Sequence, residues 1–134
     1  MERQQEPKQD LQQRISVQRV QHIVDSYLLE DNEAEPFRTY LHELLRRYPY
    51  GLVELALVDT LIESWLTIPM QKGVPFLTAA HEQIKQWQQG LERIRLTHSQ
   101  FYQITGLDPE VAFASLEEIQ FQTAPTATES TAGA

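Results

Sequence analysis

The stretch from Leu52 to Leu66 constrains the fold of this 134-residue chain more than any other segment. On a helix, its apolar side chains cover more than half of the circumference. Such a helix must be covered by other elements, so we expect it at the centre of the fold. Glu54, Asp59 and Glu63 interrupt the run, which is therefore too short and too charged to span a bilayer.

The other apolar residues also recur with a helical period, and no stretch alternates with period two. We expect a helix that begins after an N-cap at Ser16 and buries Val17, Val20, Val24, Tyr27 and Leu28. Further helices are expected at Phe37–Tyr48, at Phe76–Ile94 with Gly90 inside, and at about 98–105 and 109–120. The predicted fold class is all-α, a compact bundle of about five or six helices with flexible termini.

The two ends of the chain are polar. Residues 1–14 are rich in glutamine and predict a flexible arm, whereas residues 122–134 carry almost no large apolar side chain. A segment of that composition does not bury enough apolar surface to offset the entropy of ordering, so it predicts a disordered tail. The helical domain is then residues 15–121.

Composition excludes several classes of function. The chain has no cysteine, which rules out disulfides, thiol catalysis and thiolate metal sites. Its formal net charge of -8 disfavours binding to nucleic acid or to anionic membranes. The first residues contain no apolar segment of the signal-peptide kind, so we expect a cytoplasmic protein.

Residues 96–120 have the pattern of a helix-turn-helix. Thr97 or Ser99 is a suitable N-cap, Gly106 suits a left-handed turn, and Asp108 with Pro109 suits the start of a second helix. The "F…TGL" pattern resembles the helical N-terminal segments of some transposases, which implies DNA binding. No lysine or arginine follows Arg95, however, so a cation-poor second helix would repel phosphate. We therefore interpret this corner as closing the bundle, with a nucleic-acid-associated regulator as the alternative.

Carboxylates on the central helix are the candidates for chemistry. Glu54 falls within the apolar arc and predicts a buried carboxylate, with the helix dipole or Arg46 or Arg47 to stabilise it. Asp59 and Glu63 share one face, as acid–base or metal-binding pairs do. Histidines at Glu-x-x-His spacing are absent, so we interpret the pair as a solvated or salt-bridged face. We expect no enzyme, catalytic residue or cofactor, with a small metal-binding bundle as a third alternative.

Two segments predict a protein interface. The loop "LTIPMQKGVPF" holds the apolar residues Ile68, Met70, Val74 and Phe76, and its two prolines stiffen it, which lowers the entropy cost of binding. Met70 adapts readily to a partner surface. The second segment combines arginines and tyrosines, a composition typical of interface hot spots. Its residues are Arg46, Arg47, Tyr48 and Tyr50.

The stretches "GLVELALVDTLIESWLTIPMQKGVPFL" and "FYQITGLDP" are similar to small all-helical conserved proteins of cyanobacteria. The resemblance implies a cytosolic or thylakoid-surface accessory protein. The resulting hypothesis is a non-catalytic accessory, assembly or regulatory factor that binds a protein partner. It would reach a membrane only through that partner, and the central helix leaves a homodimer open.

Overall fold

The computed structural model describes residues 8–67 and 69–116, which form six helical stretches and no strand. The labelled helices are α1 (Lys8–Ser26), α2 (Ala34–Arg47), α3 (Tyr50–Ser64), α4 (Val74–Gln88) and α5 (His98–Thr105). A further helical stretch covers residues 109–116. The predicted all-α class is confirmed. The predicted tail, 122–134, and the first seven residues of the predicted arm lie outside the described residues.

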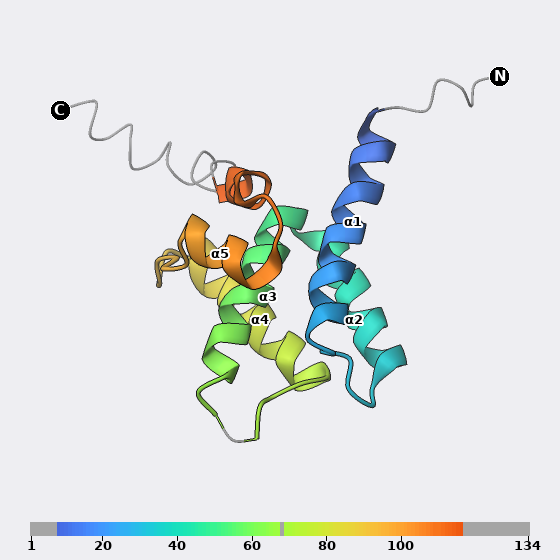
Figure 1. Cartoon of the computed structure of the whole chain (residues 1–134), viewed down its shortest axis with the longest axis vertical. Coiled ribbons are helices and arrows are strands. Elements are labelled where there is room, and N and C mark those ends of the chain that lie inside the picture. The colour runs from blue at the N-terminus through green and yellow to red at the C-terminus, as the bar shows by residue number, and fades with distance from the viewer. Residues whose placement is uncertain (1–7, 68, 117–134) are drawn as a thin grey trace.

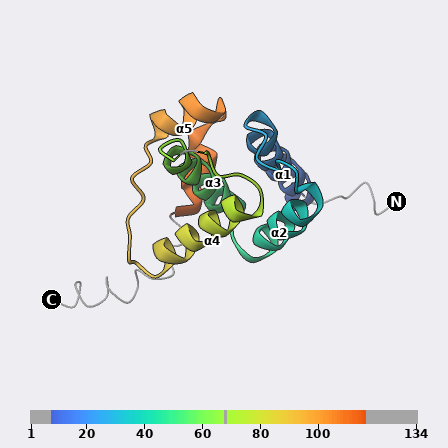
Figure 2. The same ribbon diagram turned by 90° about the horizontal axis from the view of Figure 1, so that it is seen from below.

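Helix α3 occupies the centre of the bundle, as its apolar circumference predicts. It contacts α1, α2, α4 and α5, and Figure 1 and Figure 2 show it between α5 and α4, with α1 and α2 to one side. Every residue from Leu52 to Val58 is buried. Three fully buried phenylalanines, Phe37, Phe76 and Phe101, reach the core from α2, α4 and α5. Removal of this apolar surface from water is the main force that holds the helices together.

The first helix differs from its prediction at both ends. It includes residues 8–14, so Ser16 lies inside α1 rather than at an N-cap. Val20 and Val24 are buried as expected, but Val17 is 42% exposed and Leu28 is 69% exposed. The N-terminal part of α1 projects beyond the other helices (Figure 1). Leu28 follows the helix in a left-handed conformation, with φ of 50°, and turns away from the core.

The fourth helix is shorter than predicted. It ends at Gln88, and Gly90 lies beyond it with φ of 74°, a left-handed conformation that ends helices. The chain then runs without regular structure to Thr97. Leu91 is exposed on this connection, whereas Leu96 is buried. The apolar residues of the connection keep the spacing of a helix, but Gly90 ends α4 before the helix reaches them.

The corner at 97–116 forms largely as its turn residues predict. Thr97 and Gln100 make a reciprocal capping box, and Gly106 has φ of 76°. The Asp108 carboxylate accepts the backbone N–H of Glu110 at 3.0 Å. In the second helix, Val111 is 49% exposed and its neighbour Ala112 is buried.

A glycine on α3 explains which side of the 109–116 stretch is buried. A Cβ added at Gly51 would lie 2.7 Å from the carbonyl oxygen of Ala112 and 2.9 Å from the Ser115 hydroxyl. The two helical stretches therefore approach backbone to backbone, and this crossing turns Ala112 and Ser115 inward.

Candidate functional site

The loop that was predicted as an interface folds back on the bundle. Phe76 is fully buried and belongs to the core, which contradicts its place on an exposed surface. Met70 is half-buried and packs against the core, and Val74 is half-buried at the start of α4. Ile68 lies outside the described residues. Met70 and Val74 are therefore only partly accessible at the surface of the loop.

The arginine and tyrosine corner at the end of α2 is partly exposed. Arg46 and Arg47 are exposed in the last turn, where cations suit the helix dipole. The Arg47 guanidinium lies 5.4 Å from the centre of the Tyr48 ring. Tyr48 and Tyr50 are half-buried, and the Tyr48 hydroxyl lies 3.0 Å from Nε2 of His81 on α4. The tyrosines thus help to join helices as well as to form a surface.

Glu54 is buried, with 1% of its surface exposed, as the sequence predicts. Its partner is Arg19 on α1, which donates two hydrogen bonds to the carboxylate at 2.9 and 2.8 Å. The expected pairing with Arg46 or Arg47 is therefore wrong. Burial raises the pKa of Glu54 above its usual value, and the Arg19 guanidinium opposes that rise. Both carboxylate oxygens are occupied by this pair, so Glu54 holds α1 to α3.

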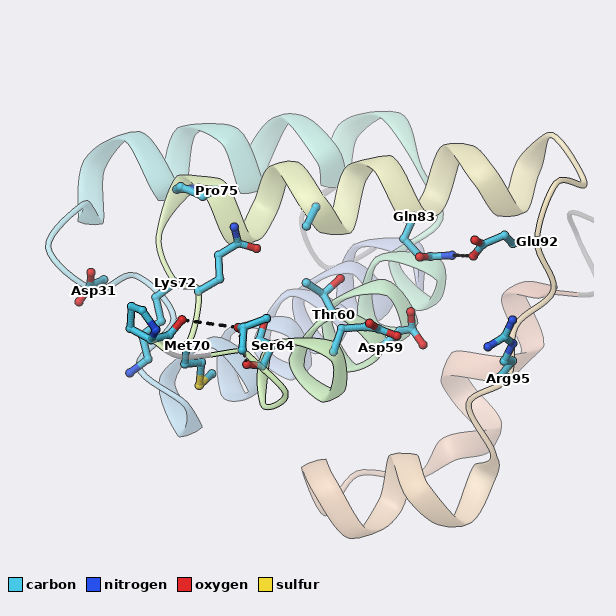
Figure 3. A pocket seen from close by; sticks show the side chains of 15 residues that line it. Asp31, Asp59, Thr60, Ser64, Met70, Lys72, Pro75, Gln83, Glu92 and Arg95 are labelled. Carbon is cyan, nitrogen blue, oxygen red and sulfur yellow. Dashed lines mark hydrogen bonds between the residues drawn. The ribbon is translucent and has the colours of Figure 1, made fainter.

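A hollow lies between α3 and α4, and we call it the α3–α4 groove. Its volume is about 1080 Å³. Figure 3 shows Met70 and Lys72 at one end, Glu92 and Arg95 at the other, and Asp59 and Thr60 between them. Its lining residues are Asp31, Asp59, Thr60, Glu63, Ser64, Thr67, Pro69, Met70, Gln71, Lys72, Pro75, Ala79, Gln83, Glu92 and Arg95.

The loop end of the groove is fixed by backbone hydrogen bonds. Gly73 donates its N–H to the carbonyl of Leu29 at 2.7 Å, and Val74 donates to the Glu33 carboxylate at 2.7 Å. Glu33 therefore caps α4 from the loop between α1 and α2, where a carboxylate also suits the helix dipole. Gly73 has φ of 74°, a conformation that L side chains rarely adopt. These contacts hold the rim of the groove in place without a bound partner.

Two hydroxyl groups open onto the groove. Thr60 is 5% exposed and Ser64 is 4% exposed, and both residues line the cavity. Within residues 8–67 and 69–116, neither hydroxyl has a hydrogen-bond partner, although the Ser64 carbonyl accepts from Thr67. No buried side-chain N or O atom in this part of the chain lacks a partner, so the two hydroxyl oxygens reach the surface of the groove, where a ligand can bond to them.

Two carboxylates flank these hydroxyls on the same helix. Burial raises the pKa of Asp59 from 3.8 to about 6, and the negative charges of Glu63 and Glu92 add to the rise, whereas Arg95 opposes it. Neither Asp59 nor Glu63 is in an ion pair within the described part of the chain, so the salt-bridged form of the predicted face is not found there. Glu63 is exposed, as the solvated form of that prediction requires, whereas Asp59 is half-buried.

The groove lacks the ligand set of a metal centre. Where the structure describes the chain, no three His, Asp or Glu side chains are grouped to hold a metal ion. The metal-binding alternative to the interaction hypothesis therefore gains no support from this site.

A second hollow continues the groove. It has a volume of about 510 Å³ and shares Asp31 and Lys72 with the α3–α4 groove. Its other lining residues are Val24, Asp25, Leu28, Glu30 and Asn32. The two hollows thus follow one another from the turn after α1 to the connection after α4.

The chemistry of the site must be interpreted from its own residues. Comparisons with protein-family models, with curated proteins and with solved structures give no match to this chain. Of the helices within the described ranges, none combines the length and the apolar character needed to cross a membrane.

Proposed function

We propose that the chain is a non-catalytic protein-interaction factor, of the accessory, assembly or regulatory kind, that binds its partner in the α3–α4 groove. The observation that carries the proposal is the pair of hydroxyls of Thr60 and Ser64, which open onto the groove without hydrogen-bond partners of their own. A partner that hydrogen-bonds to both hydroxyls would gain affinity and a fixed position in the groove.

The groove is more suited to binding than to catalysis. Its lining combines carboxylates, hydroxyls and amides with the half-buried Met70 and the prolines of the loop. Asp59 is the lining acid with a raised pKa, but the described lining holds no histidine or nucleophile–base pair to act with it. A preformed rim with polar groups that face inward is typical of a recognition surface.

The nucleic-acid alternative is disfavoured at the helix-turn-helix corner. Tyr102 and Val111 are exposed there, but no lysine or arginine follows Arg95 in the sequence. Asp108 and Glu110 are exposed at the start of the second helix, where they would repel a phosphate backbone. The proposed location of the factor is the cytoplasm, where disulfides are rare, and a chain without cysteine fits that compartment. Any association with a thylakoid surface would come through the partner.

Photo-crosslinking from the groove tests the proposal. A photoreactive amino acid at Gln71, an exposed residue of the groove, should link the protein to its partner in native lysate. A second substitution, Ala79→Trp, fills the groove and should abolish this product. The matched control Thr78→Trp places the same side chain on the adjacent exposed position of α4, outside the groove, and should retain it.

The three outcomes separate the hypotheses. A nuclease-resistant partner that A79W loses and T78W keeps supports the proposal. A partner that both variants keep contradicts the groove as the binding site. Products that disappear on nuclease treatment would instead support the nucleic-acid alternative.

A further inference from the structure

We infer that the α3–α4 groove recognises a lysine- or arginine-containing peptide segment, whose cationic side chain lies against Asp59 and Glu63 and bonds to the hydroxyls of Thr60 and Ser64. This inference rests on the proposed function, because it names the chemistry of the partner at the same site. The charges of the lining, its buried polar groups and the shape of the two hollows support it.

The charge of the lining selects a cation. Four carboxylates line the groove, from Asp31, Asp59, Glu63 and Glu92, against the two cations Lys72 and Arg95. The second hollow adds Asp25 and Glu30, although Glu30 is paired with Arg38 at 2.9 Å. Within low-dielectric walls such an excess of one sign concentrates the field on an oppositely charged ligand.

The central position offers acceptors at helical spacing. Asp59 and Glu63 lie four residues apart on α3, and Thr60 and Ser64 follow them by one residue each. All four residues line the groove, so two carboxylates and two hydroxyls face the same space. An ammonium carries three donors and a guanidinium five, and neither accepts a hydrogen bond. A cationic side chain is therefore the ligand whose donors match this set of acceptors.

Mutual repulsion of the carboxylates gives independent support. The pKa of Asp59 is raised to about 6, partly because Glu63 and Glu92 are close enough to repel its negative charge. A bound cation would relieve that repulsion and stabilise the charged form of Asp59. Binding should therefore release a proton near pH 6 and should weaken as the pH falls below that value.

The length of the depression favours a peptide over a small amine. The two hollows share Asp31 and Lys72, so a bound segment can continue from one into the other. Lys72 and Arg95 lie at opposite ends of the α3–α4 groove, as Figure 3 shows. Their positive charges would repel basic residues at the two ends of a bound segment. The carboxylates at the centre of the groove would attract a basic residue there. The expected ligand is an extended segment with its basic residue in the middle.

Fluorescence anisotropy with a synthetic probe tests the inference. The probe is a fluorescein-labelled Gly/Ser peptide with a central lysine pair, measured against the intact protein at physiological ionic strength. The variant Asp59→Asn/Glu63→Gln should weaken binding by about tenfold or more, because it removes both central charges. The control Glu35→Gln/Glu110→Gln removes two exposed charges outside both hollows and should leave the Kd nearly unchanged.

A hydroxyl variant separates specific recognition from general attraction to an acidic protein. Thr60→Val keeps the shape and charge of the groove but removes one unpartnered hydroxyl. It should weaken binding by about tenfold or more, the value of about one hydrogen bond to a charged group. Equal weakening by the exposed-charge control, or no effect of T60V, would overturn the inference.

Two further arms fix the identity of the ligand. A peptide with glutamates in place of the lysines should not bind. Free spermidine should compete only weakly, because it leaves the second hollow empty; binding of spermidine as tight as that of the peptide would overturn the peptide assignment.

Circular dichroism should show each variant folded. If the A79W variant loses its crosslinked partner but the lysine probe does not bind, the groove function stands and the basic-peptide inference fails.

Discussion

Arg19 on α1 contacts both carboxylate oxygens of Glu54 on α3, with its Nε 2.9 Å from Oε2 and its Nη2 2.8 Å from Oε1. The same Nη2 donates to the backbone carbonyl of Asp108 at 3.0 Å. One guanidinium therefore connects the first helix, the central helix and the corner before residues 109–116. Bidentate geometry of this kind is specific to arginine, because lysine presents a single point charge.

Removal of one partner of this pair should be far more costly than removal of both. Arg19→Met leaves the Glu54 carboxylate buried without a partner, and we expect a loss of about 3–5 kcal/mol in the free energy of unfolding. The double variant R19M/E54M places two apolar side chains together and should recover most of that loss. Urea unfolding of the wild type, both single variants and the double variant measures this coupling. Additive single effects would show that the two side chains do not stabilise one another.

Gly51 should tolerate no side chain. In an open helix, Gly→Ala stabilises by up to about 1 kcal/mol, because alanine has the higher helix propensity. In this chain, the added Cβ would meet the Ala112 carbonyl at 2.7 Å, and that atom belongs to a backbone that cannot rotate away. We therefore expect G51A to destabilise by about 1–3 kcal/mol. Thermal unfolding gives the sign of the effect, and a rise in Tm would contradict the close approach of α3 to residues 109–116.

The sequence predicted the elements whose causes are local. The central position of α3 follows from the apolar circumference of residues 52–66. The corner follows from Thr97, Gly106 and Asp108, each of which bonds to backbone groups within four residues. Gly90 shows where apolar spacing fails to predict the end of a helix. The apolar residues on both sides of it keep a helical spacing, but its left-handed conformation ends the helix.

The site depends on pairings between distant segments, which spacing alone does not determine. Arg19 and Glu54 are 35 residues apart, so the nearer Arg46 and Arg47 were the natural candidates from the sequence. Asp59 and Glu63 were predicted on one solvated or salt-bridged face of their helix, and the spacing did not indicate that Asp59 would be half-buried. Only the packing of α4 and the 92–95 connection beside α3 turns it into the wall of a groove. Phe76 was misassigned to an interface for the same reason, since it faces the core once α4 begins at Val74.

Asp59→Asn should stabilise the protein at neutral pH. The folded-state pKa of Asp59 is about 6 and its ordinary value is 3.8, so folding favours the protonated form. Its contribution to stability is complete below pH 3.8 and is lost as the pH rises through 6. The gain from D59N should thus be small in acid and should reach about 1–3 kcal/mol above pH 6. Chemical denaturation at several pH values measures this, and a gain that does not vary with pH would contradict it.

His81 should give a pH dependence of the opposite sign. Its Nδ1 lies 2.9 Å from the Tyr40 hydroxyl and its Nε2 lies 3.0 Å from the Tyr48 hydroxyl, so the ring joins α4 to the end of α2. Burial lowers the pKa of His81 below 6.5, and the positive charges of Lys85 and Arg47 lower it further, against a smaller opposite effect of Glu82. The folded protein therefore binds this proton less readily than the unfolded chain does.

The stability that neutral His81 contributes should be present above pH 6.5 and should be lost as the pH falls through the lower folded-state pKa. His81→Gln removes this titrating group. The free energy of unfolding of the wild type should therefore exceed that of H81Q by the largest amount at neutral pH, and the difference should become smaller in acid. The D59N comparison, measured in the same denaturation series, is the internal control, because its difference from the wild type grows as the pH rises. A difference between wild type and H81Q that increases as the pH falls would show that the two tyrosines stabilise the charged ring instead.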